Sequence, residues 1–415
     1  MTTIDQPLPT VDLTDPDLLS QGMPHEQFRA FRETSPIHWV EQEQAARHGM
    51  ATEAGNGYYA LTRHADVAAV SKNSKVFSSW ENGAIIRFPA GIEREMVEMQ
   101  RVIIINQDAP EHTHTRRIVS RAFTPRAVGG LDEVMHQRAE DIVRTALEKG
   151  EVDFVTEVAA ELPLQVIADL LGVPQEDRGK LFEWSNQMMS GEDPEYAGQS
   201  DVASAEILGY AMAMAADRLA HPREDLVTQL VHADKDGRGL TEDEFGFFVI
   251  ALTVAGNETT RNAMAHGMNS FLDHPDQWEL FKRERPTATM VDEVIRWATP
   301  VNVFQRTALE DVELNGVRVR KGQRVALFYG AANFDPEVFD DPYAFDIRRD
   351  PNPHLSFGGH GAHYCIGANL ARMEVGAIFN ALADIAPRVT RLAEADRLRH
   401  SWINGIKHLR VGLDA

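Results

Sequence analysis

The sequence feature that most constrains the fold is one long helical stretch, which runs from Thr241 to the residue before Pro275. Thr241 followed three residues later by Glu244 matches the capping box that starts helices, and Pro275 ends the stretch. An apolar stripe recurs between them at helical spacing: Phe245, Phe248, Val249, Leu252 and Ala255. At about 1.5 Å per residue, such a helix crosses a large domain. We therefore expect it to form one wall of an internal site.

Composition and charge narrow the class of protein. The chain has 415 residues, 43% of them hydrophobic, which is enough for a large core. Its formal net charge of -22 disfavours nucleic acid as a partner. Residues 1–21 contain no apolar signal segment, and the longest apolar stretch, residues 245–256, is too short to span a bilayer. Cys365 is the only cysteine, so no internal disulfide can form. We expect a cytoplasmic protein with no membrane span and no nucleic-acid partner.

No linker, charge block or repeat divides the chain, so we expect a single domain over residues 1–415, with a flexible N-terminus over about residues 1–10. Further elements follow from local patterns. Strands are predicted at residues 36–41 and 58–62, around a polar loop at 42–57; helices at 134–147, 162–171, 207–219 and about 366–386; and a hairpin at 312–319 around Asn315 and Gly316. The expected fold class is mainly α with small β-sheets.

Cys365 lies in a glycine-dense loop, residues 356–367, that leads into the last predicted helix. Its sequence is Ser-Phe-Gly-Gly-His-Gly-Ala-His-Tyr-Cys-Ile-Gly, and glycines of this kind let the main chain approach a bulky, flat partner. The positive end of a helix also favours the thiolate form of a cysteine. A lone cysteine is most often a small buried apolar residue. In this context, however, an axial metal ligand is the better interpretation.

The loop resembles the signature of the cytochromes P450, the haem-thiolate monooxygenases, which reads Phe-x-x-Gly-x-His/Arg-x-Cys-x-Gly. Four residues match it in register: Gly361, His363, Cys365 and Gly367. The family's phenylalanine stands seven residues before the cysteine, where this chain has Gly358; Phe357 lies one position earlier, so the loop is one residue longer. The resemblance implies the cytochrome P450 fold, with the long helix crossing haem b, Cys365 as the iron ligand, and Phe357 and Gly359 at the haem.

A second match lies in the middle of the long helix, where residues 255–259 read Ala-Gly-Asn-Glu-Thr. They resemble the family's Ala/Gly-Gly-x-Asp/Glu-Thr segment, which opens an oxygen-binding groove. A glycine inside a helix costs about 1 kcal/mol relative to alanine. The resemblance implies that Ala255 borders the haem, and that Thr259 and Glu258 deliver protons to bound dioxygen. Outside this context, a threonine bonded back to its own helix and a solvated glutamate would be the simpler interpretation.

Two further sets of residues stand at family positions. Glu293 and Arg296 resemble the Glu-x-x-Arg pair that, together with a later meander, locks the core beneath the haem; we predict a structural role for both. The meander begins Asn333-Phe-Asp-Pro, where relatives commonly show Asn-Arg-Asp, so Phe334 removes one usual salt-bridge partner. The haem propionates need cationic or hydrogen-bonding partners. The resemblance suggests four of these: His112, Arg116, Arg306 and His363.

The variable segments are unusually apolar, and a pocket with much hydrocarbon and little charge suits a long lipid. Each residue taken alone is more often simply part of the core. The predicted substrate-contacting residues are Trp80, Ile85, Ile86, Phe88, Met188, Met189, Val254, Val303, Phe304, Trp402 and Ile403. A lid turn is predicted at residues 191–194.

Residues 78–88, 170–182, 255–262 and 402–408 are similar to the actinobacterial steroid side-chain monooxygenases. The similarity extends over nearly the whole chain, from about Val11 to Val411, except the loop 42–57. It implies oxidation of the terminal side-chain methyl of cholesterol or cholest-4-en-3-one in steroid catabolism, by hydroxylation and often onward to the acid. It also implies a narrow funnel with the sterol rings outermost.

The implied reaction uses O2 and two electrons from outside, because the chain has no flavin or nicotinamide fingerprint and no cysteines for an iron–sulfur cluster. A separate ferredoxin and its NAD(P)H reductase are the expected partners. Five arginines are candidates for a basic docking patch: Arg116, Arg117, Arg121, Arg126 and Arg372.

Three alternatives stay open at this point. The same fold could hydroxylate fatty acids or terpenoids instead of sterols. A non-enzymatic haem-thiolate sensor or a peroxide-using variant is disfavoured by the acid–threonine pair, Glu258 and Thr259.

Overall fold

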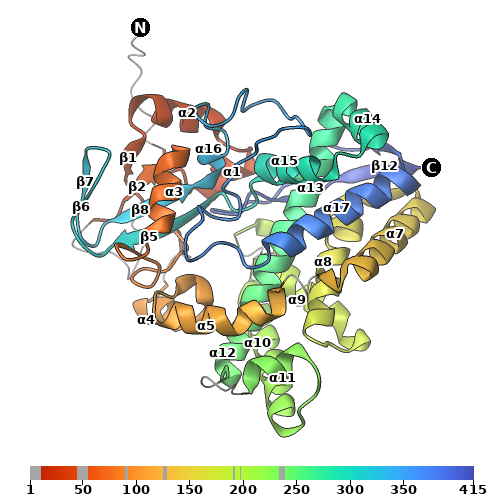
Figure 1. Ribbon diagram of the computed structural model, residues 1–415, viewed down its shortest axis with the longest axis horizontal. Coiled ribbons are helices and arrows are strands. Elements are labelled where there is room, and N and C mark those ends of the chain that lie inside the picture. Colours follow the sequence, from red (N-terminus) through yellow and green to blue (C-terminus); the bar gives the residue numbers. More distant parts are fainter. Residues whose placement is uncertain are drawn as a thin grey trace.

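The computed structural model describes residues 11–43, 55–88, 92–124, 129–189, 192–196, 198–232 and 239–415. The strands of the first eighty residues and of residues 303–328 lie on one side of the molecule, and most of the helices lie on the other side together with the C-terminal strand (Figure 1). The helices are α1 Pro16–Ser20, α2 His25–Thr34, α3 His64–Lys72, α4 Arg94–Met99, α5 Glu111–Val119, α7 Asp132–Lys149, α8 Glu161–Leu170, α9 Arg178–Met189, α10 Ser200–Ala220, α11 Leu226–Val231, α12 Glu242–Thr253, α13 Thr259–Asp273, α14 Pro275–Glu284, α15 Thr287–Ala298, α16 Tyr329–Ala332 and α17 Ala368–Ile385. The fold class predicted from the sequence is confirmed.

Short 3-10 and π segments connect these helices. The 3-10 segments are η2 Gln100–Val102, η3 Ile104–Asn106, η4 Ser120–Phe123, η6 Gln175–Asp177 and η7 Pro194–Tyr196, and the π segments are η5 Val155–Ala159 and η8 Val254–Glu258. Among the described residues, no helix combines the length and the apolar character needed to cross a membrane.

The predicted long helix is present as α12, η8 and α13 in direct succession. The capping box forms as expected, because the Thr241 hydroxyl accepts from the Glu244 N–H and the Glu244 carboxylate accepts from the Thr241 N–H. The middle of the helix was predicted as regular α-helix but widens to a π turn at η8. Such single π turns are frequent at functional sites. In Figure 1 this helix starts at the bottom with α12, and its later part, α13, runs behind α17.

A five-stranded sheet has the order β1-β2-β8-β5-β3, and it joins the first eighty residues to residues 303–328. Its strands are β1 Ile37–Val40, β2 Tyr58–Leu61, β3 Phe77–Ser78, β5 Val303–Ala308 and β8 Arg324–Phe328. The strands predicted at 36–41 and 58–62 pair antiparallel as β1 and β2, so this prediction is confirmed. Most of the loop predicted between them, residues 44–54, lies outside the described residues, as do residues 1–10.

The predicted hairpin is confirmed as β6 Val312–Leu314 and β7 Val317–Val319. Its turn needs left-handed backbone at both central residues, which Asn315 and Gly316 supply with φ of 44° and 82°. A three-stranded sheet, β4-β12-β9, and a two-stranded one, β10-β11, lie toward the chain's C-terminus. Their strands are β4 Glu151–Asp153, β9 Arg388–Arg391, β10 Asp396–Arg397, β11 Ile406–His408 and β12 Arg410–Asp414.

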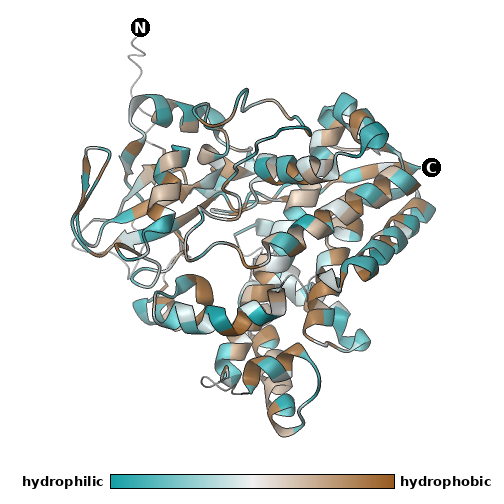
Figure 2. Cartoon of the chain, in the orientation of Figure 1, coloured by the Kyte–Doolittle hydropathy of each residue, from teal (hydrophilic) through white to brown (hydrophobic). Residues whose placement is uncertain are grey.

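The largest core lies among α7, α13, α15 and α17. Figure 2 shows α7 and α17 with hydrophilic and hydrophobic residues on opposite faces, the pattern of helices that cover a core. In α17, Val375, Ile378, Phe379 and Leu382 are fully buried. The helix begins at Ala368 instead of about 366, because Gly367 is its N-cap. Cys365 therefore lies just ahead of the first turn of α17.

Candidate active site

Cys365 is held by the backbone of the loop that carries it. Its N–H donates to the carbonyl oxygen of Phe357 at 2.9 Å, and the left-handed backbone at Gly358 (φ 92°) turns the chain between them. The thiol is exposed to solvent, yet protein atoms surround it closely. Burial therefore raises the pKa of the Cys365 thiol, while the Gly367 N–H and the charges of Arg116 and Arg372 act in the opposite direction.

Two glycines of the loop are required by close packing on a neighbouring helix. A Cβ at Gly359 would lie 2.5 Å from Ser71 Oγ, and one at Gly361 would lie 1.7 Å from the Ser71 carbonyl oxygen. Ser71 belongs to α3. The close approach to α3 is thus a reason for glycine at these two positions that the sequence-based explanation, a bulky flat partner, did not include. A contact between Gly359 and the haem stays a prediction.

The aromatic ring of Phe357 is fixed in spite of the shifted position of this residue. The Arg372 guanidinium carbon lies 4.5 Å from the ring centroid, and the His354 ring centroid lies 5.6 Å away. Arg372 in turn donates to Asp292 Oδ1 at 2.7 Å. The extra residue in the loop is thus accommodated by a cation–π contact that is itself held by an ion pair.

The four predicted propionate partners come together from three separate parts of the chain. His112 and Arg116 lie on α5, Arg306 on β5, and His363 in the cysteine loop. The ring centroids of His112 and His363 are 4.2 Å apart. Burial, together with the neighbouring Arg306, His112 and Arg116, lowers the pKa of His363 to about 2.

This group of four, the cationic cluster, has the chemistry of an anion site. Among the described residues, neither Arg116 nor Arg306 forms an ion pair, and His112 Nε2 is buried with no hydrogen-bond partner. The nearest carboxylate, Asp108, accepts from the hydroxyl of Ser78 and from the Ser79 N–H at 2.8 Å. Buried cations without counter-charges are costly. A group with two carboxylates beside Cys365 would compensate them, so the residues present fit a haem.

The mid-helix segment places Ala255 and Thr259 toward open space. Ala255 is exposed although it lies in the middle of the long helix, and Thr259 is half-buried. The Thr259 hydroxyl donates to the Ala255 carbonyl oxygen at 2.6 Å. This is the bond back to its own helix that the simpler interpretation expects. Because the Thr259 hydroxyl is the donor in this bond, the lone pairs of its oxygen stay able to accept a proton.

Glu258 is not the solvated glutamate of that simpler interpretation. Its side chain has no exposed surface, and its Oε2 lies 2.6 Å from Nη2 of Arg261. Its other oxygen, Oε1, is buried with no hydrogen-bond partner among the described residues. Burial raises the pKa of Glu258, and the Arg261 guanidinium opposes this shift. A buried carboxyl with a raised pKa is suited to exchanging protons.

Comparison with known proteins agrees with this geometry. The family model for cytochrome P450 matches residues 210–382. A steroid C26-monooxygenase from Rhodococcus jostii is 56% identical over 402 residues, which cover 96% of this chain and 84% of that protein. The chain belongs to the cytochrome P450 family.

Two more distant relatives show the breadth of this P450 group. A methyl-branched lipid omega-hydroxylase from Mycobacterium tuberculosis is 41% identical over 86% of this chain and 84% of that protein. The structure of a Mycobacterium marinum cytochrome P450 in complex with pseudoionone superposes with a TM-score of 0.90 at 32% identity, over 99% of this chain and all of that one. The predicted fold and the predicted class, a haem-thiolate monooxygenase, are confirmed.

The Glu-x-x-Arg pair of this P450 lies in the core, as predicted. Both carboxylate oxygens of Glu293 lie 2.8 Å from nitrogens of Arg296, and neither side chain is exposed. Arg296 also donates to the carbonyl oxygens of Asn333 and Pro342. Phe334, which replaces the usual arginine of the meander, lies 4.9 Å from the Arg296 guanidinium carbon and contacts it through its ring. The lost salt-bridge partner is thus replaced by a cation–π contact.

The predicted substrate-contacting residues fall into two groups. Six are partly exposed and able to border a cavity: Trp80, Ile85, Met188, Val254, Phe304 and Trp402. The rings of Phe304 and Trp402 lie 5.6 Å apart, and Val254 and Trp402 pack on the same small core of Leu398 and Ile403. The packing of Val254 on this small core brings the long helix together with the C-terminal loop.

The other group is core. Ile86, Val303 and Ile403 have no exposed surface, and Phe88 is 5% exposed and packs on Val97. Ile86 and Val303 belong to the core beneath the five-stranded sheet. The structure thus places them in packing positions, because apolar side chains on a sheet face are buried by the next layer. The side chain of Met189 and residue 191 of the predicted lid turn lie outside the described residues.

Sequence reasoning missed two polar residues near the mid-helix segment. One is Arg261, whose spacing of three residues from Glu258 was the available signal. The other is Glu374 on α17, which is fully buried and interacts with Thr260; burial raises the pKa of Glu374 to about 8. No local pattern distinguishes Glu374 from an ordinary surface glutamate, because its burial depends on how α17 packs on α13.

Proposed function

We propose that this P450 hydroxylates the terminal side-chain carbon of a sterol, with cholesterol or cholest-4-en-3-one as substrate, in steroid catabolism. The observation that carries the proposal is the 56% identity, over nearly the full chain, to a steroid C26-monooxygenase. The partly exposed apolar residues Val254, Phe304 and Trp402 support it, because they offer hydrocarbon surface beside the mid-helix segment.

The cofactor in this proposal is haem b. Cys365 would bind the iron, and the cationic cluster would hold the propionates, while Ala255, Phe357 and Gly359 would border the ring. When bound, the haem supplies the iron centre at which dioxygen is activated. The four groups of the cationic cluster and the Cys365 thiolate would together fix the orientation of the haem.

Thr259 and Glu258 have the proton-transfer role in this proposal. The hydroxyl of Thr259 is half-buried, and the next residue back in the chain, Glu258, is buried with one oxygen without a hydrogen-bond partner among the described residues. In this proposal a proton taken up by Glu258 Oε1 is passed on toward the Thr259 hydroxyl, which gives up its hydrogen bond to the Ala255 carbonyl oxygen and releases its own proton toward the oxygen site. The apolar surroundings keep bulk water away from this exchange.

A titration of the ferric holoprotein tests the substrate. Cholest-4-en-3-one is expected to displace water from the site and to shift the Soret band with micromolar affinity, and turnover is expected to yield the product hydroxylated at the terminal methyl. A straight-chain fatty acid and an acyclic terpenoid are the comparison ligands, because the relatives include a lipid hydroxylase and a pseudoionone complex. A larger response to either of these than to the sterol would favour the alternative P450 activity.

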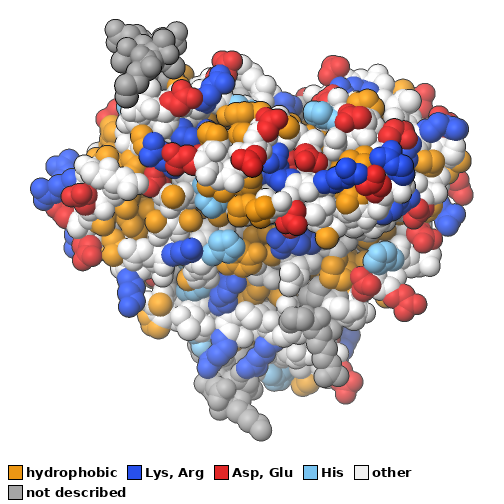
Figure 3. Space-filling view, turned by 45° about the horizontal axis from the view of Figure 1, so that its top comes forward, with side chains coloured by type: hydrophobic (Ala, Val, Ile, Leu, Met, Phe, Trp, Pro, Cys, Tyr) orange, Lys and Arg blue, Asp and Glu red, His pale blue; other side chains and the backbone are white. Residues whose placement is uncertain are grey.

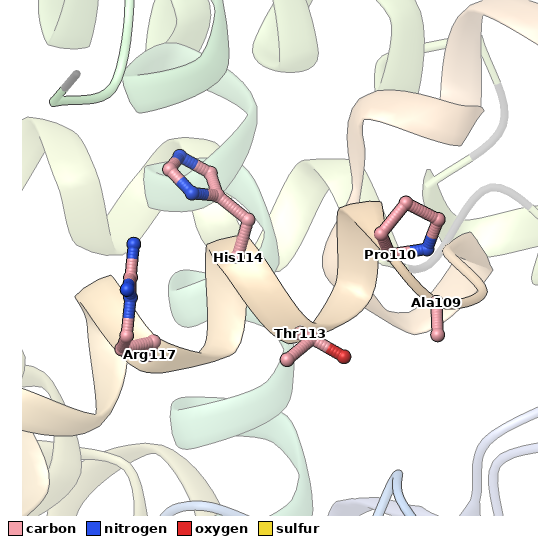
Figure 4. A pocket seen from close by; sticks show the side chains of 5 residues that line it. All are labelled: Ala109, Pro110, Thr113, His114 and Arg117. Atoms are coloured by element: carbon pink, nitrogen blue, oxygen red, sulfur yellow. The ribbon is translucent and has the colours of Figure 1, made fainter. Parts of the chain in front are cut away.

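We further propose that electrons arrive from an acidic ferredoxin, reduced by its NAD(P)H reductase, which docks beside α5. An open hollow of about 580 Å³ lies along this helix, and Figure 4 shows His114 and Arg117 extending from the same side of it. Basic side chains gather in the lower centre of the face in Figure 3, whereas acidic ones concentrate along its upper half and right edge. Charge complementarity supports an acidic partner here despite the net charge of -22.

Two of the five candidate docking arginines are used in this proposal. Arg117 and Arg121 are exposed on α5 and η4. Arg116 turns inward to the cationic cluster, and Arg372 pairs with Asp292, so neither is available for a partner. Arg126 lies outside the described residues.

Charge reversal tests this surface. Arg117→Glu and Arg121→Glu are each expected to slow reduction by an acidic ferredoxin about tenfold at low ionic strength, and less at high salt. The matched control is Arg283→Glu, an exposed arginine on α14, which Figure 1 shows away from α5. Reduction by dithionite should be the same in all variants. Equal ferredoxin rates for the α5 variants and the control would contradict docking at α5.

A further inference from the structure

Arg261 has no role in the function proposed so far, although it contacts the buried acid of the mid-helix segment. It lies one helical turn after Glu258, in α13. Its Nη2 is 2.6 Å from Glu258 Oε2, and its side chain is 7% exposed against 0% for the glutamate. A charge pair this deeply buried is not an ordinary surface pair of neighbouring helix residues, because water cannot compensate either charge.

The two carboxylate oxygens of Glu258 have different surroundings. Oε2 is fixed by the guanidinium, whereas Oε1 is buried with no hydrogen-bond partner among the described residues. Burial raises the pKa of Glu258 and the charge of Arg261 opposes the rise. Arg261 therefore does two things at once: it favours the ionised carboxylate, and it leaves one defined oxygen able to take up a proton.

The surroundings of Glu258 contain few other polar groups. The elements packed against η8 are α8, α9, α12 and α13. From α9, Ser185 accepts the Asn257 amide at 3.2 Å, and from α13, Asn262 interacts with Glu258 and also accepts the Ile406 N–H. The charged residue in the described part of the chain that acts on Glu258 is Arg261. Among the described residues, Arg261 is thus the charged group that favours the ionised form of Glu258 against burial, and Asn262 acts in the same direction.

Arg261 also faces a polar group that leads toward the surface. Tyr196 of η7 lies close enough for Arg261 to lower its pKa, although burial and Glu195 raise that pKa overall. Glu195 is 3.0 Å from Lys407 and 3.3 Å from His408, which are partly exposed. Arg261 therefore stands between the buried acid and a partly exposed group of titratable side chains.

We propose that Arg261 is a positioning residue for the proton transfer of Glu258 and Thr259, holding Oε2 of Glu258 and keeping the carboxyl ionised between turnovers. This rests on the proposed function. In each transfer, Oε1 takes up one proton that originates from solvent, the proton passes to the Thr259 hydroxyl, and the carboxylate paired with Arg261 is restored. No bond to Arg261 forms or breaks.

Replacing Arg261 by glutamine tests the proposal. A buried carboxyl without its cation needs a higher pH to ionise, so the limb of the turnover profile that rises with pH should move up by at least about one pH unit. Turnover at neutral pH should fall about tenfold or more, with less product per NAD(P)H consumed, while KM changes less than about twofold. Arg261→Lys keeps the charge and should recover most of the wild-type profile.

A direct measurement separates this role from a structural one. In infrared difference spectra against the matching Glu258→Gln proteins, Arg261→Gln should show a protonated carboxyl band at neutral pH that the wild type lacks. In the Glu258→Gln background, Arg261→Gln should change turnover by less than about twofold at each pH. The carbon monoxide spectrum and the thermal midpoint show whether each variant is folded and loaded.

The outcomes for Arg261 and for the proposed function are distinguishable. A wild type that binds and oxidises no sterol contradicts the proposed substrate, and the infrared band would still support Arg261 as the residue that keeps Glu258 ionised. An unchanged pH profile with no carboxyl band overturns the assignment of Arg261. An equal loss of turnover in the Glu258→Gln background overturns it as well, because the effect would then not pass through Glu258.

Discussion

Replacement of Cys365 by serine is expected to abolish the red-shifted Soret band of the ferrous carbon monoxide complex and to bring monooxygenase activity below detection. A hydroxyl is a much poorer anionic ligand than a thiol, and the thiolate's electron donation is what favours O–O cleavage in this family. The chain has one cysteine, so no other thiolate can take its place.

The serine variant should keep its fold, because the Cys365 side chain is exposed and its backbone bond to Phe357 does not involve sulfur. Far-ultraviolet circular dichroism should match that of the wild type. Retention of the red-shifted band in the variant would contradict Cys365 as the iron ligand, and with it the proposed haem site.

The second large effect is expected on stability, from Glu293→Leu. This change leaves Arg296 buried with no exposed surface and without its carboxylate partner, and it also removes the acceptor of Arg349 and of the Asp346 N–H. Breaking a buried pair by removing one partner typically costs about 3–5 kcal/mol. We expect a large fall in the thermal midpoint and little holoprotein.

The control for Glu293→Leu is Glu279→Leu, which breaks an i,i+3 pair at the surface. Glu279 is 2.6 Å from Lys282 but 65% exposed. Exposed pairs contribute about 0–1 kcal/mol, so this variant should keep a nearly unchanged midpoint. Similar losses in both variants would show that the buried pair of Glu293 and Arg296 contributes no more to stability than an exposed pair.

Local signals explain what the sequence predicted well. The capping box at Thr241 and the left-handed turn at Asn315 and Gly316 involve neighbours within a few residues, and both formed as predicted. The cysteine loop and the mid-helix segment were recognisable because their chemistry requires fixed residue types at fixed spacing. Even the convergence of the cationic cluster followed from a family resemblance, not from the residues alone.

What the sequence did not predict depends on packing between distant elements. The π turn at η8 places Gly256 against α8, where an added Cβ would lie 2.9 Å from Ile167. Glycine is required at positions 359 and 361 because an added Cβ would lie too close to Ser71, which is almost three hundred residues earlier in the chain. Ile86, in the loop after β3, and Val303, on β5, were expected at the substrate but are core, because burial by segments distant in the chain cannot be read from the local sequence.

The topology of the sheets has a consequence for how the protein is made. β2 pairs with β8, and β4 pairs with β12, which ends one residue before the last of the chain. Both pairings join segments separated by more than 250 residues, and contacts of such long range form slowly. During synthesis the edges of the early strands stay unpaired until the late strands have left the ribosome. A protein assembled this way can close around its cofactor only after these late strands have been made, so the supply of haem at that stage is a point at which its yield can be limited.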